Sequence, residues 1–308
     1  MTEKNYDIVI IGSGPAGITA AIYSTRGGMK TLVIAGPAPG GQLLETTNIE
    51  NFPAFEKPIS GFDLMTKMIN QAKRLGAEII NEYAKEVQIN ERPFSIKAGS
   101  EIYKAKALII ATGASTKWLS IPGEEKLKGK GVSSCATCDG FFYKDKTVAV
   151  IGGGDSAAEE AIFLTKFAKK VYLIHRRDKL RAAHILQERL KSNPKIEIIY
   201  DHIPIEILGE NKVNAIMIKN TKTQETKKLE LDGVFVAIGH HPNTEIVAGK
   251  LNLDEQGYII VNQKFETSVK GVFSAGDVCD PIYRQAIVAS GSGTIAAMNA
   301  IKLIESEE

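Results

Sequence analysis

The strongest constraint on the fold is a glycine-rich turn that occurs twice, each time between a short apolar strand and a helix-forming stretch. At the first occurrence, residues 6–11 (YDIVII) lead into Gly12, Gly14 and Gly17. In the pattern G-x-G-x-x-G, the first glycine makes the turn, the second lets a pyrophosphate approach the backbone, and the third lets helix and strand pack closely. The phosphates then face the N-terminal amides of the helix. This context predicts a dinucleotide-binding domain.

The second occurrence follows residues 147–151 (TVAVI) and consists of Gly152, Gly154 and Ala157, a G-x-G-x-x-A variant. After each turn the chain continues in the same order, with a strand, a helix, further strands and an apolar strand that ends in glycine. An internal repeat of this kind predicts two similar units. We therefore expect an α/β fold of two Rossmann-like dinucleotide-binding domains, one inserted into the other.

The domain boundaries follow from the order of the repeat. A final strand ends at Gly276 and Asp277, and the last helix, expected from about residue 284 to 304, returns to the first domain. We expect residues 1–115 and 246–308 to form the first domain and residues 116–245 to form the inserted one. A further helix is expected at residues 179–191 of the inserted domain.

The two units differ at the strand end where an acidic residue of an NAD site would bind the ribose. The strand at residues 30–34 ends in Ala35 and Gly36, so another group must supply the ribose contact. The corresponding strand of the second unit ends in His175, Arg176 and Arg177, with Arg181 nearby. Arginines at this place accommodate the 2′-phosphate of NADP. The alternative is a solvated basic turn.

Two of the three cysteines, Cys135 and Cys138, form a Cys-x-x-Cys pair just before the second glycine-rich turn. Such pairs can lower the pKa of a thiol from about 8.5 to about 7, which favours the reactive thiolate. A structural disulfide and half of a zinc site are the alternatives. Zinc needs about four ligands, but Cys279 is far away in sequence and no histidine makes a suitable spacing. The pair therefore favours redox chemistry over metal binding.

Composition narrows the class of protein further. The chain has 308 residues and a net charge of +2, which gives no electrostatic reason to expect nucleic-acid binding. No apolar run approaches the length of a membrane helix, about 18 residues, and no signal peptide is recognisable. An odd number of cysteines does not make a disulfide framework. We therefore expect a cytoplasmic protein that binds no membrane.

Several motifs occur together and in order, namely residues 135–143 (CATCDGFFY), 174–178 (IHRRD), 236–239 (VAIG), 276–277 (GD) and 284–286 (RQA). On these motifs, and over nearly its full length, the chain resembles the bacterial-type, low-molecular-weight thioredoxin reductases. The resemblance implies FAD in the domain formed by both chain ends, NADPH in the inserted domain, and a homodimer. It also implies that the inserted domain rotates, with hinges near Thr116 and near residues 243–247.

The resemblance also implies the residues that contact each cofactor. The FAD contacts map to Gly12, Gly14, Pro15, Ala16, Gly17, Ala35, Gly36, Gly40, Gly41, Gln42, Asn51, Gly276, Asp277, Arg284, Gln285 and Ala286. The NADPH contacts map to Gly152, Gly154, Asp155, Ser156, Ala157, His175, Arg176, Arg177 and Arg181. The Gly40-Gly41-Gln42 loop is similar to the loop that family members use where an acid is missing after the strand.

The mechanism that the resemblance implies is a relay. NADPH reduces the flavin, the flavin opens a Cys135–Cys138 disulfide, and the resulting thiolate reduces oxidised thioredoxin. Cys138 is the flavin-facing sulfur by resemblance, and Asp139 is a candidate general acid or base, with a helix N-cap as its alternative role. Cys279 departs from this pattern, and an inert buried thiol is expected there.

Other functions share parts of this pattern. A related flavoprotein could serve a different disulfide protein, or a related reductase could take electrons from ferredoxin. The retained arginines after residue 174 argue against the second of these. A ferredoxin–NADP reductase of similar fold would lack the cysteine pair. A flavin-binding redox sensor is the non-enzymatic alternative, and steady-state reduction of thioredoxin by NADPH would exclude it.

Overall fold

The computed structural model describes residues 3–46 and 49–307 of the chain. The chain divides into two compact units, Met1–Ser115 with His241–Glu308, and Thr116–His240. The chain therefore returns from the second unit to the first between residues 240 and 241. The sequence predicted this boundary at residue 246. The contacts of Asn243, which lies shortly after this point, explain the difference.

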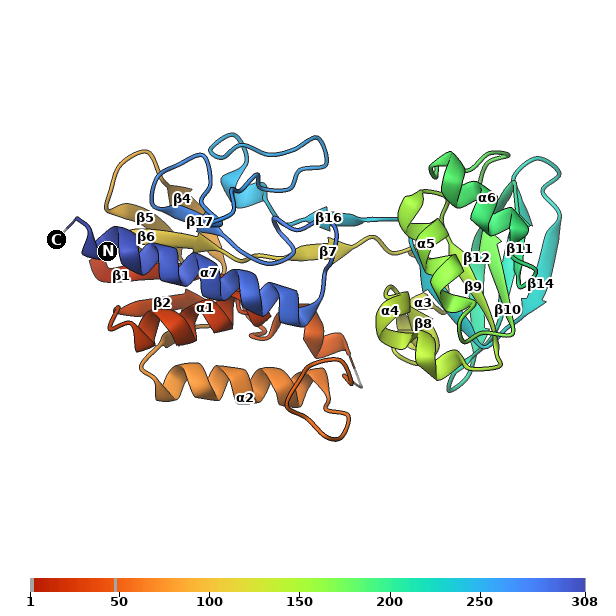
Figure 1. Cartoon of the computed structure of the whole chain (residues 1–308), viewed down its shortest axis with the longest axis horizontal. Helices are drawn as coiled ribbons and strands as arrows, with labels where there is room; N and C mark the ends of the chain where they lie inside the picture. The colour runs from red at the N-terminus through yellow and green to blue at the C-terminus, as the bar shows by residue number, and fades with distance from the viewer. Residues whose placement is uncertain (1–2, 47–48, 308) are drawn as a thin grey trace. The chain divides into compact units, whose positions relative to one another are not determined.

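Two short strands connect the units, β7 (Ala114–Thr116) and β16 (His240–Pro242), and they pair with each other (Figure 1). Just after β16, the side-chain amide of Asn243 donates to the carbonyl of Thr112 at 2.9 Å, and its backbone N–H donates to the carbonyl of Gly113 at 3.0 Å. Val247 is fully buried in the core of the first unit. Residues 243–247, which the sequence suggested as a hinge, are thus fixed to that unit.

The first unit is built on a seven-stranded sheet in the order β3-β2-β1-β6-β5-β4, with β17 also paired to β6. The central strands run parallel, and β4 and β5 add an antiparallel edge. The strands are β1 (Glu3–Ile11), β2 (Thr31–Ile34), β3 (Glu78–Ile80), β4 (Ala84–Gln88), β5 (Phe94–Ala98), β6 (Glu101–Ile110) and β17 (Val272–Ser274).

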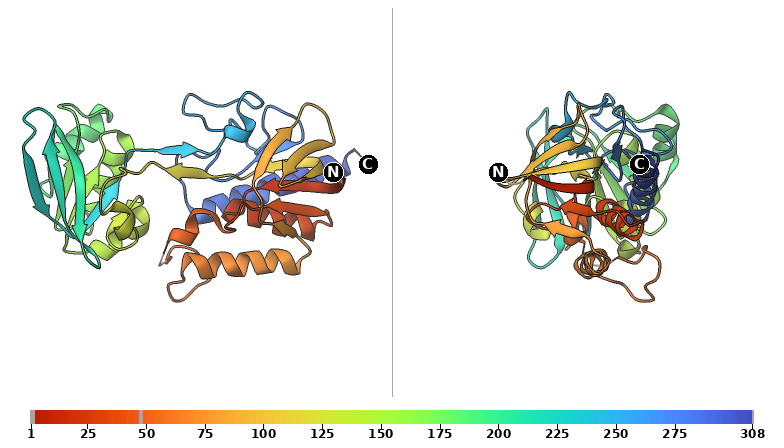
Figure 2. Two further views of the ribbon diagram at one scale, coloured as in Figure 1. Left: turned by 180° about the vertical axis from the view of Figure 1, so that it is seen from behind. Right: turned by 90° about the vertical axis from the view of Figure 1, so that its left-hand side faces the viewer.

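The apolar run of β1 is explained by burial on both faces of this sheet. Ile8 and Ile10 pack in one core cluster, while Val9 and Ile11 pack in another. A parallel strand buried on both faces reads as a continuous hydrophobic run rather than an alternating one. Helices lie along one side of the sheet (Figures 1 and 2). The helices of this unit are α1 (Pro15–Arg26), η1 (Gly41–Glu45), α2 (Gly61–Arg74), η3 (Glu245–Val247) and α7 (Ala286–Glu305).

By length and composition, α7 is the one helix in the described part of the chain that could cross a membrane, with a mean hydropathy of 1.4 over its best window. The sequence prediction missed it because Ser290, Ser292 and Thr294 interrupt its apolar run. In the structure α7 packs against α1, and a Cβ added at Gly293 would lie 2.1 Å from the carbonyl oxygen of Ala16. Close backbone approach requires glycine at this point, and α7 here is a core helix of the first unit.

The second unit repeats the plan with a parallel five-stranded sheet in the order β11-β10-β9-β15-β8 and an antiparallel sheet in the order β12-β13-β14. Its strands are β8 (Val132–Ser133), β9 (Thr147–Ile151), β10 (Lys170–Ile174), β11 (Ile196–Ile199), β12 (His202–Gly209), β13 (Val213–Asn220), β14 (Thr226–Glu230) and β15 (Gly233–Val236). Its helices are α3 (Glu124–Leu127), α4 (Ala136–Asp139), η2 (Gly140–Tyr143), α5 (Asp155–Leu164) and α6 (His184–Ser192).

One helix of this unit begins later than the sequence predicted. The stretch expected to be helical from residue 179 is a loop up to Ala183, and α6 begins at His184. The backbone N–H groups of Arg181 and Ala182 both donate to the carbonyl of Gly153, at 2.7 and 3.2 Å. These two bonds hold residues 181 and 182 against the glycine-rich turn, and α6 starts only after them.

Candidate nucleotide and disulfide sites

The first glycine-rich turn combines two closely packed glycines with one open glycine. A Cβ at Gly12 would lie 2.1 Å from the carbonyl oxygen of Ala111, and one at Gly17 would lie 2.0 Å from that of Gly12. A Cβ at Gly14 would meet nothing within 4 Å. Gly14 is also the N-cap of α1, where no side chain caps the helix. The open glycine and the uncapped amides form a cradle that suits a pyrophosphate.

The strand ends of the sheet bring the other predicted residues to this cradle. Ile11 is in register with both Ile34 and Ile110, and Ser274 is in register with Ile110. The residues that follow these strands therefore lie at the same carboxyl edge, which is where ligands bind in open α/β sheets. Gly12, Ala35, Gly36, Gly276 and Asp277 all follow such strand ends.

A serine that the sequence did not single out ties two loops to the first turn. Ser13 Oγ donates to the carbonyl of Ala35 at 2.9 Å and accepts from the N–H of Gly40 at 3.1 Å. Gln42 donates to the carbonyl of Ala114 through its side-chain amide. The Gly40–Gln42 loop and the end of β2 are thus joined around the glycine-rich turn, as the assignment of these residues to one site requires.

The C-terminal segment closes the same edge. Gly276 has a φ of +79°, its N–H donates to Ser292 Oγ at 2.8 Å, and an added Cβ would lie 2.9 Å from Ala16 Cβ. Asn51 Nδ2 donates to Gln285 Oε1 at 3.2 Å, so residues far apart in sequence meet here. Burial raises the pKa of Asp277 to about 6, helped by the neighbouring Asp280. Burial destabilises the ionised form of this carboxyl, which makes Asp277 a candidate for a hydrogen bond to a ligand.

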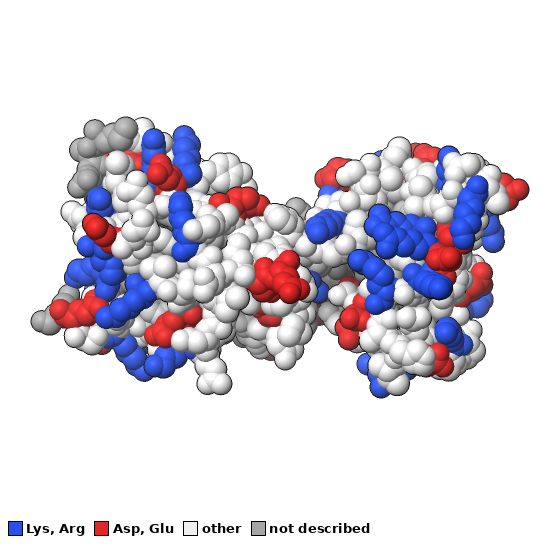
Figure 3. Space-filling view, turned by 90° about the horizontal axis from the view of Figure 1, so that it is seen from above, with Lys and Arg blue, Asp and Glu red and all other residues white. Residues whose placement is uncertain are grey.

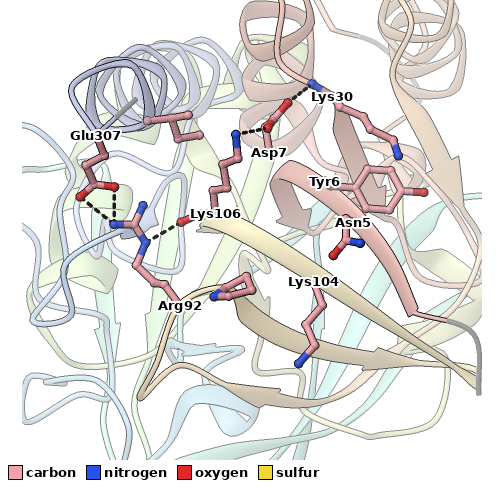
Figure 4. A pocket seen from close by; sticks show the side chains of 10 residues that line it. Asn5, Tyr6, Asp7, Lys30, Arg92, Lys104, Lys106 and Glu307 are labelled. Carbon is pink, nitrogen blue, oxygen red and sulfur yellow. Dashed lines mark hydrogen bonds and ion pairs between the residues drawn. The ribbon is translucent and has the colours of Figure 1, made fainter.

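A surface pocket of about 600 Å³ lies at the opposite, amino-terminal end of the strands (Figure 4). Its lining charges pair with each other, since Lys106 Nζ lies 3.0 Å from Asp7 Oδ1 and Arg92 Nη1 lies 2.6 Å from Glu307 Oε2. Asn5, Tyr6 and Asp7 line it from the first half of β1. None of the predicted site residues lines this pocket, and it is not the nucleotide cradle.

The second glycine-rich turn has the same construction as the first. A Cβ at Gly152 would lie 2.4 Å from the carbonyl oxygen of Ala237, whereas one at Gly154 would meet nothing within 4 Å. Ala157, the third residue of the fingerprint, is fully buried, and its Cβ would lie 2.6 Å from a Cβ on Gly152. Gly154 caps α5, again without a side-chain cap, and the neighbouring Ser156 is exposed. This turn forms a second cradle that would suit phosphates.

Beside the second cradle lies the loop between β10 and α6, which holds the predicted basic residues. Arg176, Arg177 and Arg181 are exposed, but His175 is only 5% exposed. Figure 3 shows Lys and Arg side chains gathered on one face of this unit. Three exposed arginines would suit an anionic ligand, whereas the imidazole of His175 points into the protein against Gly153. Asp155 accepts from the N–H of Ala183 at 2.7 Å.

The cysteine pair also belongs to the second unit, at the start of α4. Cys135 and Cys138 form a disulfide, with their Cα atoms 5.3 Å apart. The N–H of Cys138 lies 3.2 Å from Cys135 Sγ, and Thr137 Oγ1 lies 3.3 Å from the same sulfur. Cys138 is exposed and Cys135 is partly buried. The pair is therefore an accessible disulfide, and one of its two sulfurs, Cys135 Sγ, accepts the nearby hydrogen bonds.

Asp139 lies next to this disulfide in a partly buried position. Burial raises the pKa of its carboxyl, and a hydrogen bond from Ser133 opposes that shift. Ser133 Oγ also accepts from the N–H of Cys135 at 3.0 Å. The sequence did not single out Ser133 or Thr137, and the only signal for them was the presence of hydroxyl residues within and beside the Cys-x-x-Cys motif.

Cys279 has different surroundings from the pair. It lies in the first unit, where its thiol donates to the carbonyl of Gly276 at 3.3 Å. Burial raises its pKa to about 12, so the thiol remains protonated and unreactive near neutral pH. Within residues 3–46 and 49–307, no three His, Cys, Asp or Glu side chains form a group that could hold a metal ion.

Comparisons with known proteins agree with this arrangement. Residues 6–293 match the family described as pyridine nucleotide-disulphide oxidoreductase. A thioredoxin reductase from Rickettsia conorii is 50% identical over 303 residues, which cover 96% of this chain and 97% of that protein. The structure of thioredoxin reductase from Giardia duodenalis superimposes with a TM-score of 0.94 at 44% identity, covering 98% of this chain and 99% of that one.

One similar structure carries a name that specifies a different electron donor. It is the ferredoxin-flavin thioredoxin reductase from Clostridium acetobutylicum, with a TM-score of 0.54 and 32% identity over 99% of this chain and 100% of that one. The matches over almost the whole length, together with the two cradles and the disulfide, decide the classification. The chain belongs to the pyridine nucleotide-disulphide oxidoreductase family and, within it, to the low-molecular-weight thioredoxin reductases.

Proposed function

We propose that this chain is an NADPH-dependent thioredoxin-disulfide reductase in which FAD and the Cys135–Cys138 disulfide carry the electrons. The observation that carries the proposal is the placement of an accessible disulfide in the same unit as a phosphate cradle flanked by arginines. The other unit holds a second cradle, so each nucleotide has a site of its own. Together these parts supply each component that the proposed electron transfer needs.

FAD fits the cradle of the first unit. Gly14 leaves room for the pyrophosphate, and the amides of α1 face it. Ala35 stands where an acid would bind the ribose of NAD, and the linked Gly40–Gln42 loop offers polar groups in its place. We assign Asp277 to a hydroxyl of the FAD ribityl chain or ribose, because such a contact would relieve its unfavourable burial. Arg284, Gln285 and Ala286 would complete the site.

NADPH fits the cradle of the second unit. Gly154 leaves room for the pyrophosphate, and Arg176, Arg177 and Arg181 are exposed beside it. Arginine binds phosphate through directed, charge-assisted hydrogen bonds, so this loop suits the 2′-phosphate that distinguishes NADPH from NADH. We assign Asp155 and His175 to shaping this loop.

Bound FAD would supply the two-electron chemistry that links NADPH to the disulfide. The Cys135–Cys138 bond accepts two electrons and two protons and opens to a dithiol. Asp139 is suited to hold one of these protons, because burial raises its pKa and keeps the carboxyl protonated to higher pH than usual. The donors around Cys135 Sγ stabilise a thiolate at that sulfur.

The dithiol then reduces thioredoxin. A thiolate of the pair attacks one sulfur of the thioredoxin disulfide, and the other thioredoxin sulfur leaves with the electron pair. The second cysteine of the pair breaks the resulting mixed disulfide, which restores the Cys135–Cys138 bond and releases thioredoxin as a dithiol. The exposure of Cys138 and of the nearby Phe141 gives a protein substrate access to this region.

A homodimer and a cytoplasmic location are also part of the proposal. Ile287, Val288, Ile295 and Met298 on α7 are between 38% and 45% exposed, and Tyr23 on α1 is 39% exposed. Exposed apolar groups on adjacent helices are typical of a protein–protein interface. Sedimentation of the purified protein would measure the dimer directly.

The experiment that tests the function is anaerobic titration of the yellow protein with NADPH, followed by steady-state turnover with oxidised thioredoxin. We expect NADPH to bleach the flavin and to support continuous reduction of thioredoxin. Bleaching by NADPH without turnover on thioredoxin would point to a different disulfide protein or to a redox sensor. Bleaching by reduced ferredoxin alone would show that the donor has been assigned wrongly.

A further inference from the structure

The loop that carries the three arginines is attached to the glycine-rich turn at several points. The N–H groups of Arg181 and Ala182 donate to Gly153 O, and the N–H of Ala183 donates to Asp155 Oδ1. At its start, His175 pairs through its backbone N–H with Ile199 O at 2.9 Å. The loop is thus held at both ends, and its middle, residues 176–180, depends on other contacts.

Inside the loop, the N–H of Asp201 donates to the carbonyl of Arg177 at 3.2 Å and Leu180 is buried in the core. The His175 side chain adds a further contact. Its Nε2 lies 3.0 Å from the carbonyl oxygen of Lys179, four residues along the chain, and so donates its proton to that oxygen. Its ring also lies directly over the backbone of Gly153, where an added Cβ would be 2.2 Å from Nδ1. The imidazole therefore fills the space between the arginine loop and the glycine-rich turn.

We propose that His175 is a positioning residue for the 2′-phosphate of NADPH and does not itself contact the phosphate. Its ring spans the loop from residue 175 to residue 179 and braces it on Gly153, and this sets the directions from which Arg176, Arg177 and Arg181 approach the ligand. The proposal rests on the NADPH assignment and deepens it, because it names the residue that shapes the specificity loop.

Burial and charge agree with this role. Burial is the main reason that the pKa of His175 lies below its ordinary value. Hydrogen bonds to the backbone at Lys179 and Gly152 oppose this shift, and the positive charges of Arg181 and Arg176 add to it. A ring that is uncharged near neutral pH and 5% exposed adds no cation to a phosphate site. Its contribution is to the order of the loop, since three long side chains bind a phosphate best when their backbone is already fixed.

The experiment uses FAD-loaded full-length protein and measures binding by calorimetry, with 2′,5′-ADP as the probe of the 2′-phosphate site and 5′-AMP as the matched probe without that phosphate. His175→Leu removes the donor and keeps an apolar side chain, whereas His175→Gln keeps an N–H donor. We expect His175→Leu to weaken 2′,5′-ADP binding by about 10-fold, the worth of one hydrogen bond and the order it imposes. Binding of 5′-AMP should change by less than about 2-fold, and His175→Gln should recover most of the loss.

Asp155→Ala, which removes the tether to Ala183, should show the same selective loss and provides a second variant if His175→Leu does not fold. Parental affinity of His175→Leu for 2′,5′-ADP would overturn the inference while leaving the NADPH assignment intact. So would a loss in His175→Leu that disappears as the pH rises above the ordinary titration range of histidine, because a direct cationic contact by His175 would behave in that way. A parent protein that binds 5′-AMP as tightly as 2′,5′-ADP would overturn the NADPH assignment and the inference together.

Discussion

The backbone N–H of Cys138 lies 3.2 Å from Sγ of Cys135, so the helix that begins at the disulfide donates a hydrogen bond to the first of its two sulfurs. Thr137 adds a hydroxyl 3.3 Å from the same sulfur. Hydrogen bonds to a charged form favour that form. After reduction, the negative charge is therefore better stabilised on Cys135 than on Cys138, and the two cysteines have different roles despite their closeness.

The cysteine pair should be essential for thioredoxin reduction and dispensable for flavin binding. Cys135→Ser and Cys138→Ser each remove one sulfur of the disulfide, and both variants should lose turnover with thioredoxin. FAD content and bleaching by NADPH should persist, because the pair lies in neither glycine-rich turn. Cys279→Ala is the matched control and should retain most activity, since this thiol is buried and protonated. Near-normal turnover in either serine variant would contradict the relay.

Gly14→Ala and Gly17→Ala should impair the protein in different ways, the first through FAD binding and the second through stability. At Gly17 the new Cβ would lie 2.0 Å from a backbone oxygen, so the variant should lose about 3 kcal/mol of folding free energy or more. At Gly14 the Cβ has open space and φ is −68°, so the apoprotein should keep its stability within about 1 kcal/mol and lose FAD affinity instead. Denaturant unfolding of the apoproteins and FAD titration separate these outcomes. Normal FAD binding by Gly14→Ala would show that no phosphate approaches this glycine.

Asp277 should make the stability of the apoprotein depend on pH. Its pKa rises from 3.8 to about 6 on folding, so the folded state binds the proton more tightly than the unfolded state. Stability therefore falls as the pH rises from about 4 to about 6, and above this range the cost is up to about 3 kcal/mol. Asp277→Asn should thus stabilise the apoprotein near neutral pH, and the gain should shrink as the pH falls from about 6 to about 4. Unfolding curves across this range measure it, and a gain that does not vary with pH would contradict the assignment.

Arg176 and Arg177 should set the preference for NADPH over NADH. Two charge-assisted hydrogen bonds would contribute about 3–6 kcal/mol, and the exposure of both side chains favours the lower end, roughly a 10²-fold preference. Replacing both with alanine should raise the KM for NADPH strongly and leave NADH use almost unchanged. The preference of the parent should also weaken as salt is added. A double variant that still discriminates as well as the parent would show that these arginines form only a solvated turn.

The parts of the fold that could be predicted from the sequence are those governed by local pattern. The runs before Gly12 and Gly152 are apolar because both faces of their sheets are buried, and each glycine-rich turn follows its strand directly. The cysteine pair could be recognised for the same reason, because its two members are only three residues apart in the sequence. The parts that depend on distant contacts were predicted poorly.

The loop before α6 shows why. Residues 179–183 have a sequence compatible with a helix, but the N–H groups of Arg181 and Ala182 donate to Gly153, which is far away in sequence. The His175 ring packs against the same glycine, Gly153. Its residue type suggested a contact with NADPH, whereas its inward position and its bond to Lys179 suit it to holding the loop. The boundary at residues 240/241 lies just before the hinge suggested near residues 243–247, because the bonds of Asn243 to Thr112 and Gly113 join segments that are distant in the chain.

The relay is tested most directly by counting free thiols along the reaction. The chain has three cysteines, and in the oxidised protein only Cys279 is free, so alkylation after denaturation should label one thiol per chain. After anaerobic addition of NADPH, the count should rise to three, and oxidised thioredoxin should return it to one while two thiols appear on thioredoxin. A count that stays at one while NADPH bleaches the flavin would contradict the account, because electrons would then reach the flavin without entering the Cys135–Cys138 disulfide.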